Sequence, residues 1–491
     1  MLIPVRQRIA TLFESFEEIA SDAASGDPIE FTGYASQVRK AQSTSGESES
    51  VVIGIGEIGG HTVIAAIFEF SFLGGSMGHV AGARLEEAMM LAGRRKVPFL
   101  AVTSTGGARL QEGMAALAQM PRTVAASMEL ARRGSLRITV LSQPTTGGVY
   151  ASFASLADVI IAEEDATIGF AGPRVAEAVT GHRLEADSHT ARSAFANGLV
   201  DAVVPADQTR DEISSILGAV APATSAPPAP SRPEPFEPPT AAAWDEFTLA
   251  RHPERPAPSQ LIARIFSLTY QLHGDRAGGK DLGVWTGLAR LDETPVVIAA
   301  LDQARPTAAG FRQARRAIEL SGRLRLPLVT FIDTPGADPS FASEYGGLAG
   351  EIARTFEAIL SVKTPVISVV TGEGGSGGAL ALACGDAAAM LQHAVFSVIS
   401  PEGAAAIWRR DASKAKEVAD ELKPSALHLL KMGLVDQVIE EPGEGAHADP
   451  QGAARALGDW LRWAVHNTRA DTNLRAARFR PRRNSRGPGL T

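Results

Sequence analysis

The chain contains very little cysteine and few aromatic residues. Of its 491 residues only Cys384 is a cysteine, which excludes an internal disulfide and a zinc site built from thiolates. Cys384 lies in the run Ala-Leu-Ala-Cys-Gly-Asp, where we expect a small buried hydrophobic residue rather than a nucleophile. Aromatic residues make up 6% of the chain, which suits closely packed α/β layers and argues against a surface that stacks nucleic-acid bases.

An excess of positive charge and long apolar runs are also missing. The formal net charge of −8 argues against nonspecific nucleic-acid binding. No apolar run approaches the roughly 18 residues that a membrane-spanning helix needs, and the first residues lack the apolar core of a secretory signal. We therefore expect a cytoplasmic enzyme that uses neither a membrane nor a nucleic acid as partner.

The main positive feature of the sequence is an internal duplication. Pro98 and Pro327 open two similar strand-like runs 229 residues apart, and each run ends close to a glycine-containing turn. Two copies of Gly-Leu-Val-Asp, which begin at Gly198 and Gly433, are 235 residues apart. Because solenoid repeats are only 20 to about 50 residues long, this period indicates two copies of one domain.

Composition along the chain predicts five segments. Short β-rich runs alternate with helix-length runs in both halves, which indicates α/β domains with parallel strands. A proline-rich stretch without hydrophobic periodicity separates them and reads as an extended linker. The expected segments are an N-terminal polar and helical segment at 1–45, a first domain at 46–218, the linker at 219–243, a second domain at 244–466 and a basic, solvated tail at 467–491.

One motif imitates a dinucleotide-binding fingerprint. Gly54-Ile-Gly56-Glu-Ile-Gly59 has the required glycine spacing, but His61-Thr-Val-Ile-Ala follows it and reads as a strand rather than the required helix. We therefore predict a β-hairpin over 51–68, with no nucleotide bound at these glycines.

Glycine pairs at strand ends are the strongest sign of chemistry. Gly106-Gly107 and Gly377-Gly378 each follow a strand-like run. Backbone N–H groups at such a corner stabilise an anion, so one pair in each half suggests a site that holds two negative charges. A single pair is more often only a tight turn.

The motifs around these pairs resemble the carboxyltransferase component of acetyl-CoA carboxylase, within the crotonase/ClpP superfamily. The first half is similar to the beta subunit and the second to the alpha subunit, over about residues 50–205 and 245–445. The matching motifs are Phe68–Gly78, Gly106–Glu112, Pro144–Phe153 and Ile168–Val175 in the first half, and Leu249–Pro256, Gly274–Ala277, Phe331–Ala337, Gly372–Ala381 and Ser397–Gly403 in the second. The resemblance implies a natural beta/alpha fusion with two tandem α/β domains of the crotonase (ββα spiral) type.

The resemblance also implies a reaction. The family moves CO2 from carboxybiotin to the α-carbon of acetyl-CoA, giving malonyl-CoA for fatty acid biosynthesis. Both the thioester and the biotin ureido group gain negative charge on oxygen, and the base comes from biotin. Gly106 and Gly107 would then form the oxyanion hole for acyl-CoA, and Gly377, Gly378 and Ala379 the hole for biotin.

Further residues are assigned to binding by the same resemblance. Arginine and lysine side chains suit the phosphates of CoA, and the candidates are Arg94, Arg95, Lys96 and Arg109. Taken singly, each of them fits a solvated or salt-bridged surface residue equally well. The residues expected to shape the pocket wall are Gly74, Gly75, Gly147, Gly148, Phe170, Gly172 and Pro173.

Two departures from the family pattern bear on these expectations. The N-terminal four-cysteine zinc ribbon of bacterial beta subunits is missing, so no metal is expected. The segment at 301–309 is also shorter than in alpha subunits, and it lacks an expected basic stretch.

The sequence also predicts the partners of the chain. It carries neither a biotin-attachment motif nor an ATP-grasp signature, so biotin must arrive on a biotin carboxyl carrier protein that a biotin carboxylase serves. Homo-oligomerisation, most simply as a dimer and alternatively as a hexamer, is implied because the family's site forms between a beta-type and an alpha-type domain of different units. Alternatives are a propionyl- or longer acyl-CoA substrate, a malonate-type decarboxylase subunit, and a non-catalytic assembly subunit.

Overall fold

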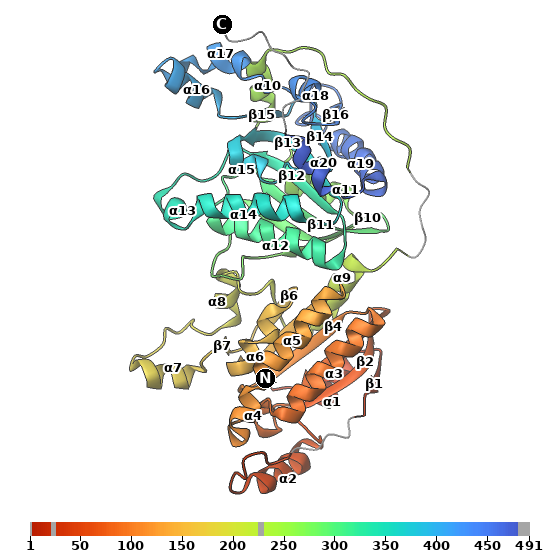
Figure 1. Cartoon of the computed structure of the whole chain (residues 1–491), viewed down its shortest axis with the longest axis vertical. Coiled ribbons are helices and arrows are strands. Elements are labelled where there is room, and N and C mark those ends of the chain that lie inside the picture. The colour runs from red at the N-terminus through yellow and green to blue at the C-terminus, as the bar shows by residue number, and fades with distance from the viewer. Residues whose placement is uncertain (1, 21–25, 224–229, 480–491) are drawn as a thin grey trace. The chain divides into compact units, whose positions relative to one another are not determined.

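A computed structural model describes residues 2–20, 26–223 and 230–479 (Figure 1). The chain divides into two compact units. Unit 1 contains Met1–Ala221 together with Leu272–Lys280, and unit 2 contains Pro222–Gln271 and Asp281–Thr491. Residues 272–280 thus pack with unit 1, although the sequence placed them inside the second domain. Each unit is described by itself below.

Unit 1 is built on a mixed sheet with the strand order β1-β2-β3-β4-β5-β6-β8, and β7 pairs with β5. The first three strands are antiparallel and the pairs from β3 onward are parallel. Its strands are β1 (Ser15–Glu18), β2 (Val51–Ile58), β3 (His61–Phe68), β4 (Phe99–Thr105), β5 (Arg137–Thr146), β6 (Val159–Glu163), β7 (Ile168–Gly169) and β8 (Ala202–Val204). Its helices are α1 (Val5–Leu12), α2 (Tyr34–Ser45), η1 (Leu73–Gly75), α3 (His79–Arg95), η2 (Leu110–Glu112), α4 (Met114–Leu117), α5 (Gln119–Arg132), α6 (Gly147–Tyr150), η3 (Phe153–Leu156), α7 (Pro173–Thr180), α8 (Ala191–Ala196) and α9 (Thr209–Val220).

Unit 2 repeats this plan with the strand order β16-β14-β13-β12-β11-β10-β9, and β15 pairs with β13. Its strands are β9 (Leu268–Leu272), β10 (Val284–Leu291), β11 (Thr294–Asp302), β12 (Leu328–Thr334), β13 (Val366–Gly375), β14 (Ala387–Leu391), β15 (Val395–Ser397) and β16 (Gln437–Ile439). Its helices are α10 (Ala243–Ala250), α11 (Pro258–Ile265), α12 (Ala308–Leu324), α13 (Phe341–Tyr345), α14 (Leu348–Ser361), α15 (Ser376–Leu380), α16 (Pro401–Trp408), η4 (Ala412–Lys414), α17 (Ala415–Val418), η5 (Ala419–Leu422), α18 (Ala426–Met432), α19 (Pro450–Asn467) and α20 (Thr472–Ala477). The predicted α/β class and the internal duplication are confirmed.

The duplicated core is a sheet covered by a pair of long helices. In unit 1, α3 and α5 pack on each other, and α12 and α14 do so in unit 2 (Figure 1). Small and aliphatic residues of α3, including Ala81, Leu85 and Ala88, are fully buried against the strands. Because both faces of the central strands are covered, β4 and β12 are buried along their whole length.

The predicted hairpin over 51–68 is confirmed. Strands β2 and β3 pair antiparallel with Val51 opposite Phe68. Gly59 and Gly60 form the turn, with φ angles of 57° and 75° that favour glycine. The glycines of the apparent nucleotide fingerprint therefore lie in a strand and its turn.

Both ends of the chain pack more closely than the sequence suggested. Near the N-terminus, β1 adds to the sheet beside β2. Near the C-terminus the expected solvated tail begins with α20, whose Arg475 is buried and forms a 2.6 Å ion pair with Asp386. The expectation of a solvated tail is therefore wrong for this helix, and residues 480–491 lie outside the described part. None of the described helices is long and apolar enough to cross a membrane.

Candidate active site

The two glycine turns of unit 1 touch each other through their backbones. Gly106-Gly107 directly follows strand β4, and Gly147-Gly148 directly follows the neighbouring parallel strand β5. Gly107 has a φ of +111°, and a Cβ added there would lie 3.0 Å from Cα of Gly147 and 3.2 Å from N of Gly148. Only glycine allows this close approach.

Unit 2 contains an equivalent pair of turns. Pro335-Gly336 directly follows strand β12, and β13 leads into α15, which contains Gly377 and Gly378. Gly336 has a φ of +123°. A Cβ on Gly378 would lie 2.7 Å from N of Ala337. Gly377-Gly378 therefore corresponds to Gly147-Gly148 of unit 1, and each unit brings a strand-end turn against a short glycine-containing helix.

Several of the expected N–H donors already have acceptors. In unit 1 the N–H of Gly106 donates to the carbonyl oxygen of Gly74 (2.9 Å). The N–H of Gly107 donates to Oγ1 of Thr105 (2.9 Å). Within the described part of the chain, no acceptor engages the N–H of Ala108 or of Gly148. The expected donors Gly106 and Gly107 thus shape the turn, whereas Ala108 and Gly148 have N–H groups available for an anion.

The same pattern is found in unit 2. The N–H of Gly336 donates to Oγ1 of Thr334 (3.2 Å), and Pro335 has no N–H to offer. Among the residues described, no acceptor engages the N–H of Ala337 or of Gly378. Ala379 follows directly and is fully buried, while a Cβ on Gly377 would meet nothing within 4 Å. The open side of this corner is therefore at Gly377.

The structure brings most of the expected wall residues to the unit 1 turns. Gly74 accepts the hydrogen bond from Gly106, and a Cβ on Gly75 would overlap the carbonyl oxygen of Ser104 at 1.9 Å. The carbonyl oxygen of Phe170 accepts the N–H of Gly147 at 2.9 Å, while the Phe170 side chain is 69% exposed. Gly172 and Pro173 follow at the start of α7, a helix with no buried residue.

Arg109 does not face a ligand, which corrects its assignment to CoA phosphates. Its side chain is fully buried and donates to the carboxylates of Glu49 and Glu112 and to the hydroxyl of Tyr34 (3.1 Å). Burial alone would lower the pKa of Arg109, but the hydrogen bond and charge of Glu49 outweigh it and raise that pKa. With its donors used internally, Arg109 holds the loop after the glycine turn.

Arg94, Arg95 and Lys96 are exposed but are not brought to the turns. They lie at the C-terminal end of α3, immediately before β4, whereas Gly106 follows the other end of that strand. Seven extended residues span about 23 Å. The structure therefore separates these three cations from the glycine corner by the length of the strand.

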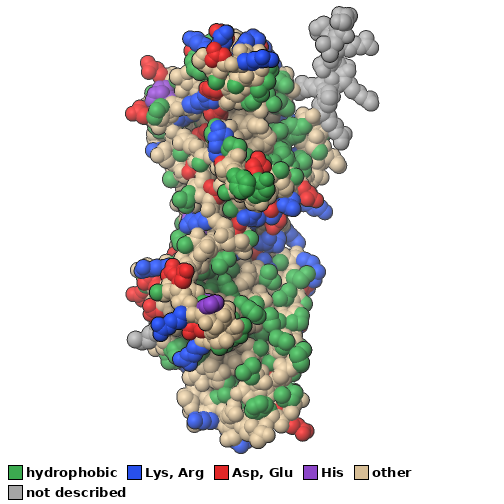
Figure 2. All heavy atoms as spheres, turned by 90° about the vertical axis from the view of Figure 1, so that its left-hand side faces the viewer, with side chains coloured by type: hydrophobic (Ala, Val, Ile, Leu, Met, Phe, Trp, Pro, Cys, Tyr) green, Lys and Arg blue, Asp and Glu red, His purple; other side chains and the backbone are tan. Residues whose placement is uncertain are grey.

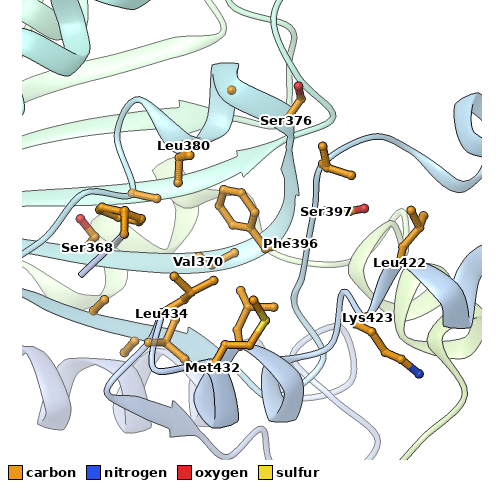
Figure 3. Close-up of a pocket in the computed structure, with 18 residues that line it drawn as sticks. Ser368, Val370, Ser376, Leu380, Phe396, Ser397, Leu422, Lys423, Met432 and Leu434 are labelled. Carbon is orange, nitrogen blue, oxygen red and sulfur yellow. The ribbon is translucent and has the colours of Figure 1, made fainter. Parts of the chain in front are cut away.

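Unit 2 contains a cavity of about 510 Å³ beside its glycine corner, which the sequence did not reveal (Figure 3). Ser376 and Gly377 of α15 line one side, and Met432 and Leu434 line another. Phe396 projects between these two sides in Figure 3. The cavity is mainly apolar, and Lys423 contributes a charged group. Its lining includes residues that belong to motifs in the sequence, among them Gly377 of the second glycine pair, Ser397 of the Ser397–Gly403 motif and Leu434 of the second Gly-Leu-Val-Asp copy.

Sequence reasoning also missed Asp333, which lies directly before the unit 2 turn. It is buried, and its carboxylate accepts the N–H of Glu373 at 2.9 Å, while its Oδ2 has no hydrogen-bond partner among the described residues. Burial raises the pKa of Asp333 to about 7, and the opposing hydrogen bonds and the charge of Arg255 reduce that shift only in part. Because its pKa is raised, the carboxyl group is neutral over a wider pH range than a free aspartate, which lowers the cost of burying it.

The described residues contain no cluster of three or more histidine, cysteine, aspartate or glutamate side chains that could hold a metal ion. At the two corners the available polar groups include the backbone N–H groups of Ala108, Gly148, Ala337 and Gly378. Such groups stabilise developing negative charge on an oxygen. The fold and these corners are typical of a class of α/β enzymes that use backbone N–H groups to stabilise an oxyanion.

Comparisons with known proteins agree with this class. Residues 240–485 match the family model of the acetyl co-enzyme A carboxylase carboxyltransferase-like domain. The acetyl-coenzyme A carboxylase carboxyl transferase subunits beta/alpha of Salinispora arenicola is 41% identical, covering 92% of this chain and 84% of that protein. A probable biotin-dependent acyl-coenzyme A carboxylase beta3 subunit of Mycobacterium bovis is 36% identical, covering 89% of this chain and 88% of that protein.

A solved structure of the transcarboxylase 12S hexamer supports the fold. It has a TM-score of 0.76 and 23% identity, and the match covers 98% of this chain and 92% of that one. The tandem crotonase-like architecture is thereby confirmed. The chain belongs to the family of acetyl-CoA carboxylase carboxyltransferases of the fused beta/alpha type, and it is an acyl-CoA carboxyltransferase.

Proposed function

We propose that this enzyme transfers the carboxyl group of carboxybiotin to acetyl-CoA and so forms malonyl-CoA for fatty acid synthesis. The observation that carries the proposal is the pair of glycine corners, since this reaction develops negative charge on two oxygens. The names of the fused relatives from several organisms support acetyl-CoA as the acceptor.

The unit 1 corner would bind the thioester oxygen of acyl-CoA. The N–H groups of Ala108 and Gly148 are the available donors, and Gly106, Gly107 and Gly147 allow the two turns to meet. Donors fixed before the reaction stabilise an enolate oxygen without reorganising, and each is worth roughly 10² to 10³ in rate. Gly74, Gly75 and Phe170 would form the surrounding wall.

The unit 2 corner would bind the biotin that a separate carrier protein delivers. When bound, carboxybiotin supplies the CO2 and the base of the reaction. The neighbouring cavity of about 510 Å³ fits this group, because Phe396, Met432 and Leu434 offer apolar contact for the sulfur ring and its arm. Gly377, Gly378 and Ala379 would orient the ureido oxygen.

The test compares acyl-CoAs of different chain length, because the Mycobacterium bovis relative is named only for acyl-coenzyme A. Purified chain is mixed with biotin carboxylase, its carrier protein, ATP, bicarbonate and acetyl-, propionyl- or octanoyl-CoA. Malonyl-CoA formation with the highest kcat/KM for acetyl-CoA supports the proposal. A preference for a longer acyl-CoA would correct the acceptor, and no transfer to any acyl-CoA would refute the function.

We also propose that the enzyme acts in the cytoplasm as a homo-oligomer, with a dimer as the simplest form. Hydrophobic side chains gather in patches on the surface drawn in Figure 2. Strongly exposed apolar residues include Leu110 at 85%, Met114 at 72% and Val179 at 80%. Exposed apolar area of this kind marks interaction sites. Light scattering on the purified protein measures the mass, and an active monomer would contradict the proposal.

A further inference from the structure

The chain contributes one loop of its second half to unit 1. We call Leu272–Lys280 the strap. It clusters with unit 1, while β9, which ends where the strap begins, and β10, which follows it, belong to the sheet of unit 2. Unit 1 is therefore made of two stretches of chain that lie on opposite sides of the proline-rich linker.

The strap packs backbone to backbone against the first Gly-Leu-Val-Asp copy. Gly198 and Gly274 have φ angles of +64° and +70°. A Cβ on Gly274 would lie 2.1 Å from Cα of Gly198, and a Cβ on Gly198 would lie 2.2 Å from the carbonyl oxygen of Gly279. The N–H of Arg276 donates to the carbonyl oxygen of Gly198 at 3.1 Å. Only a glycine on each side permits this fit.

Asp201 anchors the strap through charge. Its carboxylate is buried and accepts the N–H of His273 at 3.0 Å and the guanidinium of Arg276. It also accepts the N–H of Ile160 from β6 at 2.8 Å. A buried carboxylate that loses such donors destabilises the protein. The strap therefore supplies hydrogen bonds that the buried Asp201 carboxylate would otherwise lack.

Ring contacts and internal hydrogen bonds complete the fit. The ring of Phe195 meets the His273 ring edge-on at 5.1 Å, and Nζ of Lys280 lies 3.7 Å from the Phe195 ring centroid. Within the strap, Asp275 accepts the N–H groups of Ala277 at 2.7 Å and Gly279 at 2.8 Å. These bonds fix the loop in its own shape, which reduces the entropy lost when it docks.

The second Gly-Leu-Val-Asp copy shows what is special about the strap. Asp436, the counterpart of Asp201, forms an ion pair with Arg478 at 2.8 Å. Arg478 comes from the same half of the chain, just after α20. The equivalent aspartate thus forms an ion pair with an arginine in each unit. In unit 1, however, that arginine lies in the part of the sequence that follows the linker.

We propose that the strap is the noncovalent fastening between the two halves of the chain. Unit 1 presents a recognition surface made by Phe195, Gly198 and Asp201, and its partner is the Gly-Asp-Arg loop of the second half. The linker is then dispensable for holding the halves together. This role is independent of which acyl group the enzyme carboxylates.

The test cuts the linker of the full chain. A recognition sequence for a site-specific protease is inserted between Pro222 and Pro239, the purified protein is cleaved, and the dissociation constant of the halves is measured by dilution and light scattering. We expect the cut halves to remain associated. Arg276→Gln, made in the same protein, should weaken their association at least about tenfold, because it leaves the buried Asp201 carboxylate without its charged partner.

Arg478→Gln is the matched control, because it breaks the equivalent ion pair inside unit 2 and should leave the association of the halves unchanged. The proposal is overturned if the halves with the native strap separate, or if Arg276→Gln weakens association no more than Arg478→Gln does. Should Arg276→Gln fail to accumulate as folded protein, His273→Ala replaces it. That variant keeps the N–H donor and removes the ring contact with Phe195, so unchanged association would also overturn the proposal.

Discussion

The hydroxyl of Tyr34 donates a 2.6 Å hydrogen bond to the carboxylate of Glu112. Tyr34 begins α2, and Glu112 lies in the loop that follows the unit 1 glycine turn. Glu112 also accepts the N–H of His79 at 2.6 Å, and Arg109 pairs with it. The N-terminal segment around α2 is thus tied to the loop beside the proposed oxyanion site.

Replacing Tyr34 by Phe should lower the free energy of unfolding by about 1 to 3 kcal/mol, because it leaves the buried Glu112 without one of its donors. Urea denaturation measures the change. Tyr345→Phe is the control, since Tyr345 is 81% exposed and should be neutral. Equal stability of the two variants would show that the hydrogen bond between Tyr34 and Glu112 contributes nothing to the free energy of unfolding.

Replacing Arg109 by Gln should destabilise the protein by about 3 to 5 kcal/mol, because Glu49 is left buried without its cation. Arg94→Gln, on the exposed end of α3, should leave stability within about 0.5 kcal/mol. Thermal and urea unfolding measure both variants. A normally stable Arg109→Gln protein with a raised KM for acyl-CoA would restore the phosphate-binding interpretation.

Asp333 should make stability depend on pH. Its pKa is raised from 3.8 to about 7 in the folded state, so the folded protein binds more protons than the unfolded chain in that range. Its stabilising contribution is therefore complete below pH 3.8 and is lost as pH rises to about 7. Asp333→Asn removes this effect and should gain stability relative to the native protein by up to about 1.4 kcal/mol per pH unit there.

Urea unfolding of both proteins at several pH values between about 5 and 8 checks the Asp333 prediction. Two charged groups act on the Asp333 carboxyl group: the charge of Arg255 lowers its pKa, and the charge of Glu373 raises it. A difference between the two proteins that does not change with pH would mean that Asp333 is ionised throughout.

We predict that the protein works without zinc. One cysteine and scattered histidines do not supply the usual four ligands of a structural zinc site. Elemental analysis of the purified, active protein should find no stoichiometric metal. Stoichiometric zinc that disappears together with activity on chelation would contradict this.

The sequence was informative wherever the pattern is local. The strand-like run that begins at His61, directly after the Gly54–Gly59 motif, predicted the hairpin. Runs of apolar residues before Gly106 and Gly336 predicted buried strands that lead into turns. Recurrence of the same motifs at a long spacing predicted the duplication. These features depend on periodicity and turn chemistry, which are visible within a few residues.

The sequence was uninformative where partners are distant along the chain. Arg109 looked like a phosphate ligand because its partner Glu49 lies 60 residues away, and nothing local marks it as buried. Gly274 packs on Gly198 from the other side of the linker. The carbonyl oxygen of Gly74, which accepts the N–H of Gly106, is likewise distant along the chain.

The most direct test of the account measures carboxyl transfer from carboxybiotin to acetyl-CoA by Gly107→Val and Gly378→Val, with Gly350→Val in helix α14 as the control. A side chain at Gly107 would meet the Gly147 backbone, and one at Gly378 would meet the N–H of Ala337. Provided that both variants are folded, kcat should fall by at least about two orders of magnitude in each. Gly107→Val should weaken acyl-CoA binding more, and Gly378→Val biotin binding more. Near-normal transfer by both folded variants would contradict the account and leave these glycines as packing residues only.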